Sequence, residues 1–255
     1  MSTAVIFIFA LLPLLAYFVK GIVGAASAIV FNAALLLGIA FGLNGEVSLR
    51  DGLYWVGMAD FVTSFVLWYF LRRDLRPERQ TVLLLAGMLP VSIVFALMIE
   101  SIDLGWLMAA LAIAITLAGI WLIYSRDHEL ARESTLNWIA FPCGLLSGVL
   151  SGLFSMAGPV VILFLAAGSK DPRVLRARLV FISLCANTAR MTTLVFAGAY
   201  TEQRMKWAAL SAPAVLIGLL AGNACARFVK PVQFRVMLGV LVAIAGIAAG
   251  VKVFL

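Results

Sequence analysis

Long apolar runs separated by short charged connections make up most of the sequence. The runs cover residues 3–43, 52–71, 81–99, 104–124, 137–168, 179–200, 207–226 and 236–254. All but the first and fifth have the length of one helical membrane span, about 20 residues. Backbone polar groups must be satisfied internally in the hydrocarbon, and the runs lack the period-two alternation of barrel strands. The pattern therefore predicts transmembrane helices.

The first and fifth runs are too long for a single span. At about 1.5 Å per residue they would form helices of roughly 60 and 48 Å, whereas the hydrocarbon core is about 30 Å thick. Small residues interrupt both runs, at residues 20–24 and 151–155. Each run therefore predicts a helical hairpin that returns to the side from which it entered, either as a re-entrant loop or as two full spans.

The distribution of Arg and Lys supports the hairpins. If every run crossed once, the connections would carry eight basic residues on each side, which contradicts the expected cytoplasmic excess. With two hairpins, thirteen basic residues fall on one side and four on the other. We therefore expect both termini outside and the connections 72–79, 126–136, 170–178 and 227–235 in the cytoplasm.

The same topology predicts two inverted repeats. Residues 1–125 would form the first repeat, with hairpin 3–43 and three spans. Residues 126–136 would form a cytoplasmic linker, and residues 137–255 the second repeat, with hairpin 137–168 and three spans. Matching residues in the same order support this division: Lys20-Gly21 with Ser151-Gly152, Ala59-Asp60 with Ala186-Asn187, Gln80 and Pro90 with Gln203 and Pro213, and Gly119-Ile120 with Gly246-Ile247.

The expected fold is thus an all-α polytopic membrane protein of two inverted repeats, each a broken or re-entrant helical hairpin followed by three transmembrane helices. Paired broken helices in inverted repeats are typical of secondary transporters, whose binding site lies near the membrane midplane where the breaks meet. The sequence therefore points to transport of a solute across the membrane.

Composition excludes several other classes of protein. Hydrophobic residues make up 64% of the chain and charged residues 12%, against about half and a quarter in soluble domains. The net charge of +7 comes from basic residues in the short connections. This distribution is typical of cytoplasmic loops and not of a nucleic-acid-binding surface. The three cysteines show no metal-ligand spacing, and His128 lies in a polar connection without a nucleophile partner. We expect no enzyme activity, no cofactor, no metal and no nucleic-acid partner.

The glycine-rich stretch from Gly144 to Pro159 resembles the hairpin of the TauE/SafE sulfite and organosulfonate permeases, in the four-toluene-sulfonate uptake permease superfamily. The first copy, from Lys20 to Ser27, lacks the glycine cluster and the proline. Chain length, segment number and the stretch 213–218 also fit the family. The resemblance implies a secondary carrier of the cell inner membrane for sulfite, a sulfonate or a related sulfur-containing anion. No GxxxxGK[ST] motif of an ATPase is present.

Three charged residues lie well inside apolar runs, away from their ends: Lys20, Asp60 and Arg190. An ionisable group at that depth costs several kcal/mol and is a functional candidate. We expect Arg190 to be the principal anion contact, because a guanidinium can hold an oxyanion with two parallel hydrogen bonds. Asn187 lies one turn earlier on the same face. Asp60 is expected to hold Arg190 in the empty site and is the candidate for ion coupling; a purely structural Arg190–Asp60 pair is the alternative.

The two hairpin breaks should complete the substrate site. Half-helices starting near Gly24 and Ser155 would turn their unsatisfied amides toward an anion. Lys20 at the first hairpin tip would neutralise its charge, unless this lysine extends to the membrane interface. The remaining candidates are backbone and hydroxyl groups of the breaks: Ser27, Ser151, Ser155 and Gly152. The serines could instead simply permit close helix packing.

The predicted function is therefore a permease for a small sulfur-containing anion such as sulfite or an organosulfonate. An anion channel, or a carrier of a small carboxylate or other organic anion, is the alternative. The expected partners are a small anionic substrate and the lipid bilayer. The sequence leaves the oligomeric state open, with a homodimer as one candidate.

Overall fold

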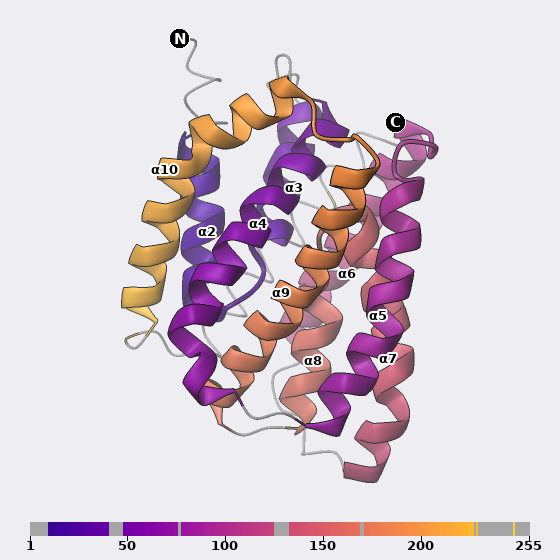
Figure 1. Cartoon of the computed structure of the whole chain (residues 1–255), viewed down its shortest axis with the longest axis vertical. Helices are drawn as coiled ribbons and strands as arrows, with labels where there is room; N and C mark the ends of the chain where they lie inside the picture. The colour runs from indigo at the N-terminus through magenta and orange to yellow at the C-terminus, as the bar shows by residue number, and fades with distance from the viewer. Residues whose placement is uncertain are drawn as a thin grey trace.

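The structure, a computed structural model, describes residues 10–40, 48–75, 78–124, 133–168, 171–226, 228 and 247. Every regular element within these ranges is a helix (Figure 1). In chain order the elements are α2 (Leu12–Val23), α3 (Ser27–Ala40), α4 (Leu49–Leu71), the short 3-10 helix η2 (Arg72–Asp74), α5 (Arg79–Met98), α6 (Leu104–Tyr124), α7 (Glu133–Phe154), α8 (Gly158–Gly168), α9 (Pro172–Phe196) and α10 (Glu202–Cys225).

In the described part of the chain, five stretches are long and apolar enough to cross a membrane: Leu49–Asp74, Arg79–Met98, Thr135–Phe154, Arg173–Phe196 and Glu202–Cys225. Long apolar faces also remain exposed on the bundle surface, as a lipid environment requires. The predicted all-α, multi-pass membrane fold is confirmed.

Two helices begin earlier than the apolar pattern predicts, because capping residues lie upstream of it. Ser48 accepts the amide of Asp51 at 3.2 Å, so α4 starts at Leu49. Asp171 accepts the amide of Arg173 at 2.9 Å, so α9 starts at Pro172. The stretch 172–178 is therefore helical and not a connection. Such caps satisfy the free amides of the first helical turn.

Both predicted hairpin breaks are present. Helix α2 ends at Gly24 with φ of 89°, and the Gly24 amide donates to the carbonyl of Lys20 at 2.7 Å. Ala26 follows with φ of 78°. Helix α7 ends at Ser155 with φ of 57°, and its amide donates to Ser151 at 3.0 Å. A left-handed residue ends a helix but costs roughly 1–2 kcal/mol when it carries a side chain.

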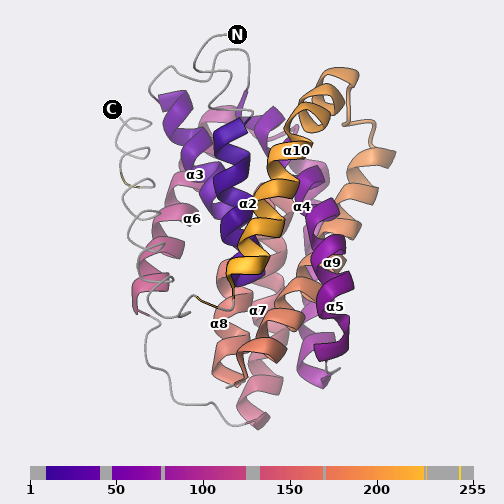
Figure 2. The ribbon, with the colours of Figure 1, turned by 90° about the vertical axis from the view of Figure 1, so that its left-hand side faces the viewer.

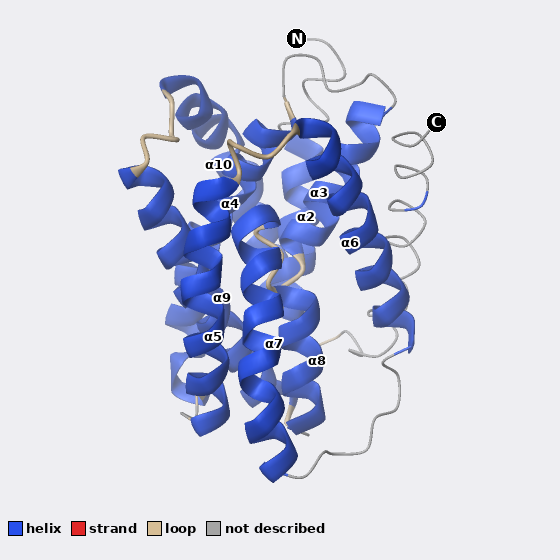
Figure 3. Ribbon diagram, turned by 90° about the vertical axis from the view of Figure 1, so that its right-hand side faces the viewer, coloured by secondary structure: helices blue, strands red, loops and turns tan. Residues whose placement is uncertain are grey.

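The two hairpins enter the bundle from opposite ends. The α2–α3 hairpin lies toward the end with the α9–α10 connection, and α7–α8 toward the other end (Figure 2). Both breaks lie inside the bundle, where they appear as tan segments between helices in Figure 3.

Helix packing is reciprocal between the hairpins. Helix α2 packs along α10, α7 packs along α5, and α4 lies against α9. A repeat predicts such an exchange of partners. The last predicted span, 236–254, lies outside the described residues except for residue 247. Of the predicted linker 126–136, residues 126–132 lie outside the described residues, and residues 133–136 belong to α7. The division into two complete inverted repeats stays a prediction.

Glycines set the closeness of both helix pairs. A Cβ added at Gly148 or Gly152 of α7 would lie 2.7 Å from the carbonyl oxygen of Met88 or Ser92 in α5. Added Cβ atoms at Gly218 and Gly222 of α10 would likewise overlap backbone carbonyls of α2. The glycine-rich stretch therefore allows backbone-to-backbone helix packing, as small residues do between membrane helices.

We predict that Gly148→Ala lowers the melting temperature of the detergent-solubilised protein by several degrees. The added methyl group has no space between α7 and α5, and overpacking costs roughly 1–3 kcal/mol. Gly38→Ala is the matched control, since nothing lies within 4 Å of a Cβ added there. Equal melting temperatures for the two variants would contradict the packing role of Gly148.

Candidate functional site

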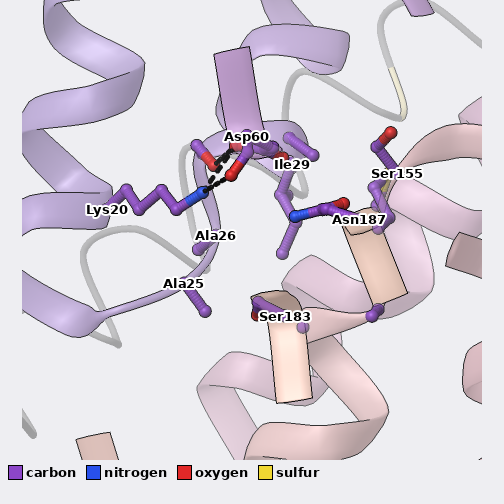
Figure 4. Close-up of a pocket in the computed structure, with 13 residues that line it drawn as sticks. Lys20, Ala25, Ala26, Ile29, Asp60, Ser155, Ser183 and Asn187 are labelled. Atoms are coloured by element: carbon purple, nitrogen blue, oxygen red, sulfur yellow. Dashed lines mark hydrogen bonds and ion pairs between the residues drawn. The ribbon is translucent and has the colours of Figure 1, made fainter. Parts of the chain in front are cut away.

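A small cavity lies where the two breaks meet (Figure 4). A Cβ added at Gly158, at the start of α8, would lie 3.7 Å from both Ala25 and Ala26 of the first break. The sequence-predicted meeting of the breaks is thus confirmed. Six polar or charged side chains contribute to the cavity wall: Lys20, Ser27, Asp60, Ser155, Ser183 and Asn187.

The cavity is very small, with a volume of about 20 Å³. Holding a single water requires roughly 10–15 Å³ by this measure. The site as it stands therefore has room for a water molecule and not for a sulfonate.

The first turns of two helices line this cavity. Helix α3 begins at Ser27 and α8 at Gly158, and residues of both first turns form part of the wall. The first amides of a helix have no intrahelical acceptor and carry a partial positive charge. Two such helix ends meeting at one cavity favour a negatively charged ligand.

Lys20 and Asp60 form a buried ion pair in the cavity wall. The Nζ of Lys20 lies 2.9 Å from Oδ1 of Asp60, and the two side chains are 2% and 4% exposed. The ammonium also donates to the Asp60 carbonyl at 3.1 Å, to Thr63 Oγ1 at 2.9 Å and to Ser64 Oγ at 3.0 Å. Figure 4 shows Lys20 extending toward Asp60 from α2.

This pairing corrects the sequence prediction. Asp60 was expected to hold Arg190, but no Arg190–carboxylate pair occurs within 4 Å among the described residues. Lys20 reaches Asp60 because α2 and α4 bring the two side chains to the same depth. Lys20 is therefore already neutralised by Asp60 in this structure, instead of being a free cation for the substrate.

Ser27 and Asn187 extend the same polar network. The Ser27 hydroxyl donates to Oδ1 of Asp60 at 2.6 Å, so it caps the carboxylate from the first turn of α3. The Asn187 amide donates to Ser64 Oγ at 3.4 Å, from α9. One hydrogen-bonded cluster thus joins α2, α3, α4 and α9 at the cavity.

Arg190 lies on the other side of the second break. Its side chain is buried, with Nε donating to the Gly152 carbonyl at 3.1 Å and Nη2 to the Leu53 carbonyl at 3.4 Å. Its Nη1 has no hydrogen-bond acceptor in the described part of the chain. The Ser155 hydroxyl is likewise buried without a partner there.

Gly57 provides the space in which these two unpartnered groups lie together. A Cβ added at Gly57 would overlap Nη1 of Arg190 and lie 3.2 Å from the Ser155 hydroxyl. Arg190 itself is not part of the cavity wall, but Ser155 is. Ser155 therefore connects the cavity to an arginine donor that still lacks an acceptor.

The other predicted site residues lie outside the cavity wall. Gly24 packs against the side chain of Arg176, since an added Cβ would be 2.9 Å from its Cγ. Ser151 faces α5, where Ser92 donates to its hydroxyl at 3.4 Å. Gly152 packs against α5 and offers its carbonyl to Arg190. These three residues position the breaks.

Several residues that the sequence prediction missed take part in the site. Thr63 and Ser64 follow Asp60 by three and four positions, and Ser183 precedes Asn187 by four, so helical spacing could have found them. Asn32 donates to the Phe154 carbonyl at 2.8 Å and ties α3 to the end of α7. Its role depends on packing and has no local signal.

Two further arginines fasten parts of the bundle outside the cavity wall. At one end of the bundle Arg204 binds Asp51 at 2.8 Å and Glu100 at 3.5 Å, and its guanidinium lies 4.0 Å from the Tyr54 ring centroid. At the first break Arg176, expected in a connection, binds the Gly21 carbonyl and Asn223. In the α9–α10 connection, burial raises the pKa of the Tyr200 phenol, so this group stays protonated.

Comparison with known proteins assigns the chain to a family. The family described as sulfite exporter TauE/SafE matches residues 8–249. The chain belongs to the TauE/SafE family. The probable inner membrane transporter protein TsaS of Comamonas testosteroni is 27% identical over 169 residues, covering 65% of this chain and 69% of TsaS. No solved structure matches. Membership of TauE/SafE makes the chain a membrane transporter and not an enzyme.

We predict that Lys20→Met strongly lowers the melting temperature, because it leaves the Asp60 carboxylate buried without a cation. Removing one partner of a buried pair costs about 3–5 kcal/mol. The double variant Lys20→Met/Asp60→Leu should recover most of the loss. Thermal unfolding of the single and double variants measures this coupling. A double variant no more stable than Lys20→Met would show that the pair does not contribute in this way.

Proposed function

We propose that this TauE/SafE protein is a secondary carrier of the inner membrane that moves a small sulfur-containing oxyanion, such as sulfite or an organosulfonate. The observation that carries the proposal is the buried Arg190 guanidinium, whose Nη1 has no acceptor among the described residues and lies beside the unpartnered Ser155 hydroxyl. Buried donors without acceptors are costly, so such a pair is well suited to receive a ligand oxygen.

The neighbouring charges favour a monoanion. Lys20 and Asp60 neutralise each other, whereas Arg190 has no carboxylate partner in the described part of the chain. The three side chains together therefore carry one positive charge. One sulfonate group would balance it, while the first amides of α3 and α8 and the Asn187 side chain offer further donors.

The small volume of the cavity favours a carrier over a channel. Its volume of about 20 Å³ cannot admit a sulfonate, so substrate entry requires the two breaks to separate. A channel would need a continuous open path. A carrier opens the site to one side at a time and closes it in between, as transporters with paired broken helices do. The family description as sulfite exporters supports a sulfur oxyanion as substrate.

We predict that Arg190→Lys weakens sulfonate binding by roughly 10- to 100-fold. Lysine keeps the charge but loses the planar donor pair, and charge-assisted hydrogen bonds contribute about 1.5–3 kcal/mol. Ligand-induced stabilisation of purified protein by sulfite, sulfoacetate, taurine, sulfate and small carboxylates measures the affinities and ranks the substrate classes.

Lys206→Gln is the control for Arg190→Lys, because Lys206 forms an exposed pair with Glu202 at 2.7 Å, far along α10 from the cavity. This variant should bind as the unmodified protein does. Normal sulfonate affinity in a well-folded Arg190→Lys protein would rule out Arg190 as the anion contact. If only carboxylates stabilised the protein, the proposed substrate class would change from a sulfur oxyanion to an organic acid.

We also predict the orientation of the chain in the membrane. In a cysteine-free background, single cysteines at the exposed positions Ser101 and Thr201 should react with an impermeant maleimide added outside the cell. Cysteines at Asp74 and Asp171, at the opposite end of the bundle, should react only after permeabilisation. Outside labelling at Asp171 would overturn the proposed topology, with both termini outside.

A further inference from the structure

We propose that Asp60 is a proton-binding site and that its protonation makes Lys20 available to the substrate, so that a proton and the anion bind together. This inference rests on the proposed anion transport and adds the coupling ion to it. The starting observation is that the Lys20–Asp60 pair lies in the wall of the same cavity as Ser155 and Asn187, instead of within a packed helix interface (Figure 4).

The hydrogen bonds of the pair leave a defined place for the proton. Lys20 and Ser27 both donate to Oδ1 of Asp60, at 2.9 and 2.6 Å. We place the incoming proton from the aqueous phase at Oδ2, to which neither Lys20 nor Ser27 donates, and no bond between heavy atoms forms or breaks. Lys20 remains an ammonium group throughout.

Lys20 can keep its position when Asp60 is neutral. Its ammonium has three N–H donors. Three uncharged acceptors lie at 2.9 to 3.1 Å: Thr63 Oγ1, Ser64 Oγ and the Asp60 carbonyl. Protonation of Asp60 thus removes the counter-charge of Lys20 without removing its hydrogen bonds. The result is a cation that is held at the cavity wall with its charge unbalanced.

Few other charged groups face Asp60. The Tyr17 hydroxyl of α2 donates to the Val56 carbonyl at 3.2 Å and also lies within hydrogen-bonding reach of the Asp60 carboxylate, and Arg190 of α9 contributes its positive charge. Helix α3 offers Ser27. The charged residues of α10 and of η2 lie at the helix ends, away from the cavity: Glu202, Arg204, Lys206, Arg72, Arg73 and Asp74. Within the described ranges of the chain, no second carboxylate lines the cavity.

The charge balance links the two ligands. With Asp60 ionised, Lys20, Asp60 and Arg190 carry one positive charge in total, and with Asp60 protonated they carry two. A bound anion therefore favours protonation, and protonation favours anion binding by the same factor, since linkage is reciprocal. A proton gradient would then drive the anion in the direction in which the protons move.

The test uses the full-length protein in liposomes and radiolabelled 4-toluenesulfonate, a probe that keeps its charge between pH 5 and 8. Exchange between equal probe concentrations inside and outside measures transport without a driving force. Net uptake after external acidification measures coupling. We expect the protein to exchange the probe. We also expect an inwardly directed proton gradient to raise accumulation of the probe in the liposomes several-fold, and a protonophore to abolish this rise.

Asp60→Asn should exchange the probe at a rate independent of pH and should lose accumulation driven by the proton gradient. If the single variant does not fold, the neutral double variant Lys20→Gln/Asp60→Asn should exchange the probe more weakly, because it lacks the Lys20 cation, and its remaining exchange should not respond to the proton gradient. Lys206→Gln is the control and should keep both activities. A gradient response that persists in either Asp60 variant would overturn the proposal.

Two outcomes separate this inference from the proposed function. Exchange by the unmodified protein without any response to the proton gradient would overturn proton coupling and leave anion transport standing. No exchange of 4-toluenesulfonate, sulfite, taurine or sulfate would overturn the proposed function itself. One further measurement needs no variant. When 4-toluenesulfonate is added to the purified protein in weak buffer, the protein should take up protons from the solution. An absence of proton uptake would contradict the proposal.

Discussion

The structure depends on how backbone groups are satisfied where two helices stop inside the membrane. A helix end there leaves carbonyls without intrahelical partners, so donors from elsewhere in the protein must satisfy them. Arg176 donates to Gly21 near the end of α2, and Arg190 donates to Gly152 near the end of α7. Two arginines of α9 thus stabilise both breaks, and a cation suits the negative end of a helix. The same requirement places positive charge beside the cavity.

Much of the fold could be predicted because its signals are local. The length of an apolar run decides whether it can be one span, and the interruptions near Gly24 and Ser155 placed both breaks correctly. The meeting of the breaks followed from their equivalent positions in the chain. Lys20, Asp60, Ser27, Asn187 and Ser155 were found because polar groups deep in an apolar segment are costly unless they have a role.

The pairing of these groups could not be predicted, because it depends on which helix faces meet. Asp60 pairs with Lys20 across α2 and α4, although Arg190 lies at a similar depth in the sequence pattern. Arg176 lies in a charged part of the sequence that was predicted to be a connection. The helix α9 includes it because Asp171 caps the helix at Pro172, and Arg176 then reaches the Gly21 carbonyl at the first break. The glycine-rich stretch suggested a ligand loop, whereas most of its glycines face α5.

That glycine packing has a consequence for how the protein can move. Because the backbones of α7 and α5, and of α2 and α10, are in direct contact, we expect the two helices of each pair to move together. Each pair combines the first arm of one hairpin with a helix from the other half of the sequence. Separation of the breaks would therefore not divide the chain at its midpoint near residues 126–136, because each half of the sequence contributes a helix to both pairs.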